Sequence, residues 1–114
     1  GDTKHLSNLI AKGIEHKGFS LIDIFSPCVT YNKISTYEWF RERIYRLEDL
    51  GHDSSNMDMA IKKSYEWDAK IPIGLFYETI KPTYEELDPN FQKGPLVKQE
   101  HLKLDPDIAL REFL

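Results

Sequence analysis

The chain has 114 residues, of which 40% are hydrophobic, so it is long enough for one small domain with a core. Its net charge of −4 argues against a general nucleic-acid binder, and no apolar run approaches the ~20 residues of a membrane span. A single cysteine cannot form an internal disulfide, so nothing indicates secretion. We therefore expect a soluble, cytoplasmic α/β protein with no membrane and no nucleic-acid partner.

The N-terminal stretch predicts a helix followed by a buried strand. Apolar residues recur at helical spacing from Leu6 to Ile14, with Asp2 as the N-cap and a stop at Gly18. Residues 19–25 are mostly aromatic or branched, which is typical of a strand buried on both faces. A helix joined to a strand by a short turn is usual in the second half of a βαβ crossover. The strand that should precede the helix is missing, so we expect the chain to be a piece of a larger domain.

Two further helices are predicted in the middle of the chain. The first covers residues 35–50, with Ser35 as N-cap and a glutamate three residues later, which is the pattern of a capping box. The second covers residues 55–67 and begins at Ser55. We expect these helices to form an αα-hairpin inserted between two strands.

The second predicted strand spans residues 71–77. Pro72 indicates an edge strand or a strand start, and Gly74 indicates a close approach of another part of the chain. With this strand, residues 1–80 complete the expected α/β portion.

Residues 81–114 differ in character from the rest of the chain. Prolines interrupt them, charges are frequent and no period holds, which predicts an extended arm. Asp105-Pro106 then predicts the start of a short terminal helix. The arm is expected to pack only through a few apolar side chains: Tyr84, Leu87, Phe91 and Leu96.

Cys28 follows the first expected strand, which Ser26-Pro27 ends. In open α/β sheets, ligands collect beyond the carboxyl ends of the strands. From the residues alone, a lone cysteine is most often a small buried hydrophobe. The loop holds no base to activate a catalytic thiol, and the chain has no second cysteine for a metal site. The histidines have no ligand spacing and are expected at the surface or at helix ends: His5, His16, His52 and His101.

The stretch from Gly18 to Asn32 resembles the late part of the β subunit of 2-oxoacid:ferredoxin oxidoreductases. Its most specific part is Ser-Pro-Cys-x-Thr-x-Asn after a buried strand. The similarity continues through residues 37–40, 51–53 and 71–77. It implies a fold class: the C-terminal part of a thiamine-diphosphate-binding, doubly wound α/β sheet, with the αα-hairpin inserted and the arm appended.

The resemblance also implies a role for Cys28. The matching cysteine of that family is the fourth ligand of a [4Fe–4S] cluster whose other ligands lie upstream. Thr30 and Asn32 are then candidates to donate hydrogen bonds to cluster sulfur. The alternative, that both only satisfy the backbone of the loop, stays open. No residue of the chain is implied as catalytic.

The enzymes that the chain resembles pair a β subunit with an α subunit in a heterodimer. They decarboxylate a 2-oxoacid, pass the acyl group to coenzyme A and send electrons through the cluster to ferredoxin. They also bind thiamine diphosphate and Mg²⁺, whose Gly-Asp-Gly…Asn motif is absent here, so this piece alone is expected to be inactive. The alternative is a non-catalytic α/β interaction module that docks a partner through its aromatic side chains.

Overall fold

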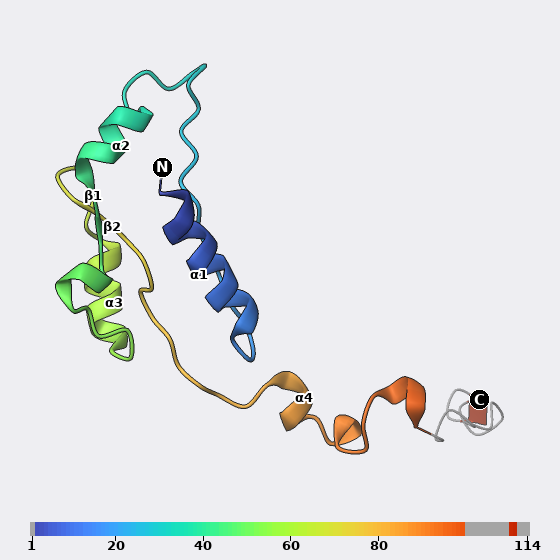
Figure 1. The fold of residues 1–114 in the computed structure, drawn as a ribbon. Helices are drawn as coiled ribbons and strands as arrows, with labels where there is room; N and C mark the ends of the chain where they lie inside the picture. The colour runs from blue at the N-terminus through green and yellow to red at the C-terminus, as the bar shows by residue number, and fades with distance from the viewer. Residues whose placement is uncertain (1, 100–109, 112–114) are drawn as a thin grey trace. The chain divides into compact units, whose positions relative to one another are not determined.

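The structure is a computed structural model that describes residues 2–99 and 110–111. The chain divides into two compact units, Gly1–Lys81 and Pro82–Leu114. Figure 1 shows the first unit from blue to yellow and the second in orange. Within the described residues, no helix has the length and apolar character needed to cross a membrane.

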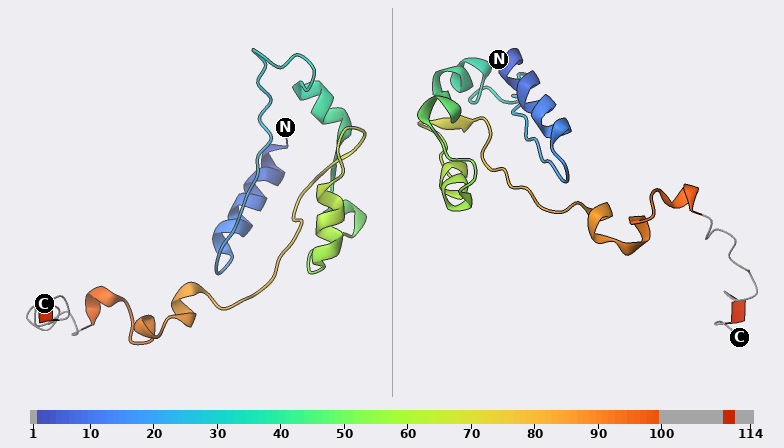
Figure 2. Two further views of the ribbon diagram at one scale, coloured as in Figure 1. Left: turned by 180° about the vertical axis from the view of Figure 1, so that it is seen from behind. Right: turned by 60° about the horizontal axis from the view of Figure 1, so that its bottom comes forward.

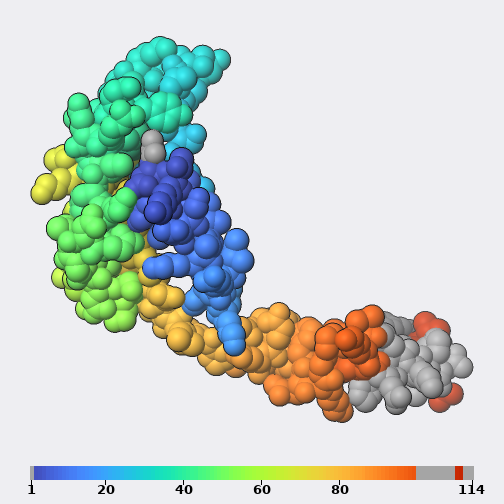
Figure 3. Space-filling view, in the orientation of Figure 1, coloured from blue at the N-terminus to red at the C-terminus, as the bar shows by residue number. Residues whose placement is uncertain are grey.

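Helix α1 (Thr3–Glu15) opens the first unit. The side chain of Asp2 accepts the backbone N–H of His5 at 3.0 Å, which confirms Asp2 as the N-cap. Asp2 also pairs with Arg46, and His5 Nε2 lies 3.5 Å from Glu48 Oε2. These contacts hold the start of α1 against the green part of the unit in the space-filling view (Figure 3).

The chain reverses direction after α1. Gly18 has a φ of +116°, a conformation that glycine adopts at little cost. Residues 19–25 then run back beside α1 (Figures 1 and 2). A β-carbon at Gly13 would lie 2.9 Å from Ile22 Cδ1, so this glycine permits the close packing of helix and segment.

Residues 19–25 are extended but form no β-strand, so that prediction is wrong. The sheet in the described part of the chain has two strands, and both lie elsewhere. Phe19 and Leu21 are 84% and 82% exposed. An apolar run of this kind suits a strand with neighbours on both sides. Residues 2–99 supply α1 beside it and no partner strand.

The helix predicted for residues 35–50 is also wrong beyond its first half. In the structure this stretch divides into α2 (Tyr37–Arg43), β1 (Ile44–Arg46) and the 3₁₀ turn η1 (Glu48–Leu50). Ile44 and Tyr45 are β-branched and aromatic, and such side chains lose rotamer freedom in a helix and favour strands. Residues 44–46 form a strand because they pair with β2, at residues 71–73.

The N-caps of the two middle helices lie one residue beyond the predicted serines. Thr36 caps α2, and its hydroxyl accepts the N–H of Trp39 at 3.4 Å. Asn56 caps α3 (Met57–Ser64), and its side-chain oxygen accepts the N–H of Met59 at 3.0 Å. The predicted serines are polar neighbours of the true caps.

Strand β2 (Ile71–Ile73) pairs with β1 in parallel, with Ile44 opposite Ile71. Parallel neighbours need a long crossover connection, and here it contains α3. The middle of the chain is therefore a β1–α3–β2 unit and not the predicted αα-hairpin. This confirms the α/β class. A larger doubly wound sheet stays a prediction.

The core of the first unit is small and lies between β1, α3 and β2. Leu47, Ala60 and Ile71 are 0%, 6% and 1% exposed. The N–H of Leu47 donates to the carbonyl of Ile73 at 2.9 Å and extends the parallel pairing beyond β1. Full burial of a leucine or isoleucine side chain stabilises a fold by about 1.5–3 kcal/mol. Leu47 and Ile71 therefore hold the β1–α3–β2 unit together.

The chain after β2 is tied back to the segment between β1 and α3. The N–H of Leu75 donates to Glu48 Oε1 at 3.0 Å, and His52 Nε2 donates to the carbonyl of Phe76 at 2.8 Å. Gly74 has a φ of +128°, and a β-carbon there would collide with the Glu48 carboxylate. The close approach predicted at Gly74 is therefore confirmed.

The second unit contains short helical turns. They are α4 (Tyr84–Leu87), η2 (Pro89–Phe91) and η3 (Leu96–Lys98). Thr83 and Glu86 form a capping box that starts α4, and the rings of Tyr84 and Phe91 lie 6.0 Å apart. The predicted arm is therefore partly helical. Leu110 and Arg111 are helical, while the rest of the predicted terminal helix lies outside the described residues.

Candidate functional site

The loop at residues 26–35, hereafter the Cys28 loop, connects the extended segment to α2. Residues 29–31 form a turn, and the N–H of Asn32 donates to the carbonyl of Cys28 at 2.9 Å. Lys33 Nζ donates to the carbonyl of Val29 at 2.7 Å. The loop is therefore fixed by its own hydrogen bonds although its residues are mostly exposed.

Cys28 is a free, exposed cysteine, so the interpretation of a buried hydrophobe is wrong. The backbone N–H groups of Tyr31 and Thr30, with a smaller contribution from Asn32, hold the pKa of the Cys28 thiol below its ordinary value, and slight desolvation opposes them. A lowered pKa increases the share of thiolate, which is the form that binds metals and acts as a nucleophile.

Thr30 and Asn32 make different hydrogen bonds in the loop. The side-chain oxygen of Asn32 accepts the N–H groups of Ile34 at 3.0 Å and Ser35 at 2.9 Å. The loop backbone thus occupies this oxygen. The backbone N–H of Asn32 donates to the Cys28 carbonyl, so a further hydrogen bond from Asn32 would come from its amide nitrogen. Thr30 contributes its backbone N–H beside the sulfur.

Four aromatic rings meet at the base of the Cys28 loop, and we call them the aromatic cluster: Phe25, Trp39, Phe40 and Trp67. Their centroids lie 5.0–6.2 Å apart. The sequence predicts mutual core packing of six aromatics of the expected αα-hairpin: Tyr37, Trp39, Phe40, Tyr45, Tyr65 and Trp67. The structure confirms mutual packing for Trp39, Phe40 and Trp67, whereas Tyr37 and Tyr65 are 52% and 82% exposed. Sequence reasoning missed Phe25, whose position three residues before Cys28 could have drawn attention to it.

A shallow hollow adjoins the aromatic cluster. It is lined by Trp39, Glu42, Arg43, Asp68 and Ala69. The guanidinium of Arg43 lies 4.5 Å from the Trp39 ring centre and donates to the Trp39 carbonyl and to Glu42. The charge of Arg43 is therefore compensated within the chain.

The histidines in the described part of the chain link elements. His5 faces Glu48, His16 Nδ1 lies 3.8 Å from Glu78 Oε1, and His52 bonds the Phe76 carbonyl. Each lies at a helix end or in a turn, and His101 lies outside the described residues. Among residues 2–99 and 110–111, no group of three His, Cys, Asp or Glu side chains could hold a metal ion. The described residues therefore form no complete metal site around Cys28.

Residues 28–93 match a family described as the C-terminal region of the beta subunit of pyruvate ferredoxin oxidoreductase. The match begins at Cys28 and includes α2, both strands, α3 and α4. It therefore covers the Cys28 loop from Cys28 onward and the whole β1–α3–β2 unit.

The chain is also similar to several curated proteins. It is 45% identical over 96 residues to the 2-oxoacid:ferredoxin oxidoreductase subunit beta of Sulfolobus sp, covering 75% of this chain and 32% of the relative. It is 42% identical over 93 residues to 2-oxoacid:ferredoxin oxidoreductase 1, subunit beta, of Aeropyrum pernix, covering 72% and 29%. The subunit beta of Saccharolobus solfataricus is 40% identical over 109 residues, covering 82% and 36%. The chain thus spans about a third of the length of these relatives.

Proposed function

Because the chain belongs to the family of C-terminal regions of pyruvate ferredoxin oxidoreductase β subunits, we propose that it is the C-terminal part of the β subunit of a 2-oxoacid:ferredoxin oxidoreductase. On this proposal the complete enzyme decarboxylates a 2-oxoacid, transfers the acyl group to coenzyme A and reduces ferredoxin. The relatives named above are β subunits of such enzymes, which supports an α subunit as partner.

Cys28 is the residue that we assign a role in this enzyme, as one ligand of a [4Fe–4S] cluster. Its thiol is exposed and has a lowered pKa, because backbone N–H groups surround the sulfur. Iron–sulfur clusters need thiolate ligands, and hydrogen bonds to the sulfurs tune their potentials. The Cys28 thiolate and the N–H groups around it therefore fit one ligand position of a cluster. When bound, the cluster supplies a one-electron carrier.

The remaining ligands must come from outside the described residues. Those residues contain no further cysteine, and no other His, Asp or Glu completes a three-residue group with Cys28. Ligands from distant segments are usual for these clusters. On our proposal, most ligands of thiamine diphosphate and Mg²⁺ lie outside this chain, because it lacks the Gly-Asp-Gly…Asn motif that would hold them.

Ligation is favoured over nucleophilic catalysis by the composition of the Cys28 loop. A catalytic thiol is activated by a nearby base, and residues 26–35 contain neither histidine nor carboxylate. The one amine of the loop, Lys33, donates to a backbone carbonyl. The lowered pKa of Cys28 comes from amides instead. The chain's own contribution is to present a thiolate in a fixed, exposed loop.

The test is Cys28→Ala in the full-length β subunit, assembled with its α partner. We expect the variant to lose iron and to reduce ferredoxin far more slowly with a 2-oxoacid and coenzyme A. Val29→Ala is a matched control, since Val29 is the next residue and is 56% exposed. A Cys28→Ala enzyme with full iron content and the wild-type rate would refute the assignment.

A further inference from the structure

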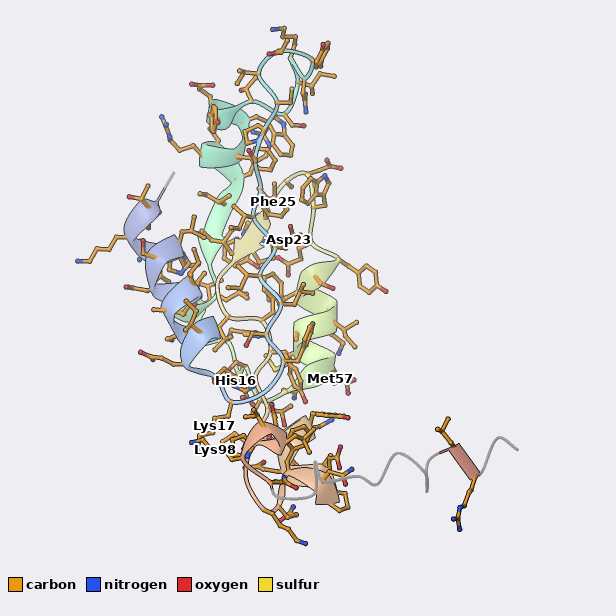
Figure 4. The ribbon with its side chains drawn as sticks, turned by 90° about the vertical axis from the view of Figure 1, so that its right-hand side faces the viewer. His16, Lys17, Asp23, Phe25, Met57 and Lys98 are labelled. Carbon is orange, nitrogen blue, oxygen red and sulfur yellow. The ribbon has the colours of Figure 1, made fainter. Side chains whose placement is uncertain are left out.

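The extended segment before Cys28 packs on the aromatic cluster through Phe25. Phe25 stacks on Phe40 with centroids 5.6 Å apart and an interplanar angle of 17°, and it meets Trp67 edge-on at 5.5 Å. Figure 4 shows Phe25 on this segment, among side chains of the first unit. In contrast, Phe19 and Leu21 of the same segment are largely exposed.

Phe25 and Phe40 lie on opposite sides of Cys28 in the sequence. Their contact brings together the two ends of residues 26–39 and closes them into a loop that contains the thiol. Closing a loop of this length removes much of its conformational freedom. Trp39 and Trp67 pack on Phe40 at 5.0 Å and 6.2 Å, so the closure is anchored on α2 and on the chain after α3.

We propose that Phe25 is a positioning residue that fixes Cys28 for ligation by closing its loop onto Phe40 and Trp67. The proposal rests on the proposed role of Cys28 as a cluster ligand. A ligand thiol must be positioned accurately because the cluster is also bound by ligands from other segments. A ligand has to be held within about 0.5 Å of its productive position by packed neighbours. The hydrogen bonds inside the Cys28 loop fix its shape, whereas the ring contacts fix its place on the unit.

The chain offers matched variants for a test. Phe25→Leu keeps an apolar side chain but removes the ring, and Phe25→Tyr keeps the ring. Phe19→Leu is the same change on the same segment, at a position that lies outside the aromatic cluster. All variants are made in the full-length β subunit with its partner. Exchange of amides around the buried Leu47 reports whether the first unit remains folded.

Two quantities are measured: hydrogen exchange of peptides covering the Cys28 loop in cluster-free protein, and the rate at which a chelator removes iron from the loaded complex. We expect Phe25→Leu to raise both by about fivefold to tenfold, the scale of losing aromatic contacts. Phe25→Tyr should restore both to near wild-type values, and Phe19→Leu should change neither. Exchange around Leu47 should be unchanged throughout.

Failure of this proposal is distinguishable from failure of the proposed function. Unchanged loop exchange in Phe25→Leu would overturn the positioning role whatever Cys28 does. Faster loop exchange with an unchanged rate of iron removal would also overturn it, because the ring would then serve only the fold. Retention of iron in Cys28→Ala would refute the ligand assignment itself.

Discussion

Backbone N–H groups lower the pKa of two side chains, Cys28 and Glu48. In Cys28 the amides of the following turn favour the thiolate. In Glu48, burial acts to raise the pKa, but the backbone N–H groups of Glu48 and Leu75, together with His5, bring it below the ordinary value of 4.5. For Cys28 the amides belong to the following turn, whereas for Glu48 one of them comes from Leu75 in the chain after β2.

Glu48 gives the fold a pH dependence of defined sign. A carboxylate with a lowered folded pKa stabilises the fold above its unfolded pKa, and this contribution is lost as the pH falls through the folded value. We expect Glu48→Gln to lower the free energy of unfolding at neutral pH. The difference from the wild type should shrink as the pH falls below 4.5. Urea unfolding across a pH series measures it, and a difference independent of pH would count against this account.

Several single residues are predictable from the sequence because their roles are local. Asp2 as N-cap and Gly74 as a point of close approach follow from the intrinsic properties of aspartate and glycine. The position of Cys28 in a loop after Pro27 is predictable for the same reason, but its exposure is not. The ring contacts of Phe25 are not, since they depend on residues from two other parts of the chain.

At the scale of elements, tertiary pairing overrides helical periodicity between α2 and β1. Tyr37, Phe40, Ile44 and Leu47 recur at helical spacing, which predicts a single helix. In the structure the helix ends at Arg43, and Ile44 pairs with Ile71. The spacing includes the buried Leu47, but it also includes Tyr37, which is 52% exposed, and it predicts the wrong backbone for Ile44.

Leu47 and Leu50 provide a matched test of this arrangement. Leu47 is fully buried beside β2, whereas Leu50 is 68% exposed. We expect Leu47→Ala to lower the free energy of unfolding by about 2–5 kcal/mol, and Leu50→Ala to change it by less than about 0.5 kcal/mol. Chemical denaturation of both variants measures this. Equal losses at the two positions would contradict the position of the core.

The strand predicted for residues 19–25 is wrong for a different reason than the helix predicted for residues 35–50. Its apolar pattern predicts a strand, but a strand exists only with hydrogen-bonded neighbours. The described residues contain no partner strand for it, and it remains extended beside α1. The apolar pattern of residues 19–25 therefore suits a strand between partner strands, and the described residues do not supply those partners.

At the scale of the whole molecule, the chain presents apolar side chains that a partner would cover. The chain spans about a third of the length of its relatives, which are subunits of larger enzymes. In the first unit Phe19 and Leu21 are exposed, and in the second unit Tyr84 and Leu87 are 72% and 68% exposed. On the proposed function, the rest of the β subunit and the α subunit supply the covering surfaces.

The second unit allows a direct test of whether a partner surface covers these apolar side chains. Tyr84 and Leu87 lie on a single helical turn, too short to be stable alone in water. We expect amides of residues 83–99 to exchange quickly in the isolated chain and to be protected in the complex with the α subunit. Hydrogen exchange with mass spectrometry measures both states. Equal exchange in the two states would mean that this unit contributes nothing to the interface.

The central claim, that Cys28 is a ligand of a [4Fe–4S] cluster, is tested most directly by the electron paramagnetic resonance spectrum of the reduced complex. Cys28→Ser replaces one sulfur donor by oxygen and leaves the rest of the loop unchanged. The account predicts an altered cluster spectrum, or loss of the cluster signal, in Cys28→Ser, with a wild-type spectrum in the neighbouring Val29→Ala. A wild-type spectrum in Cys28→Ser, at wild-type intensity, would contradict it.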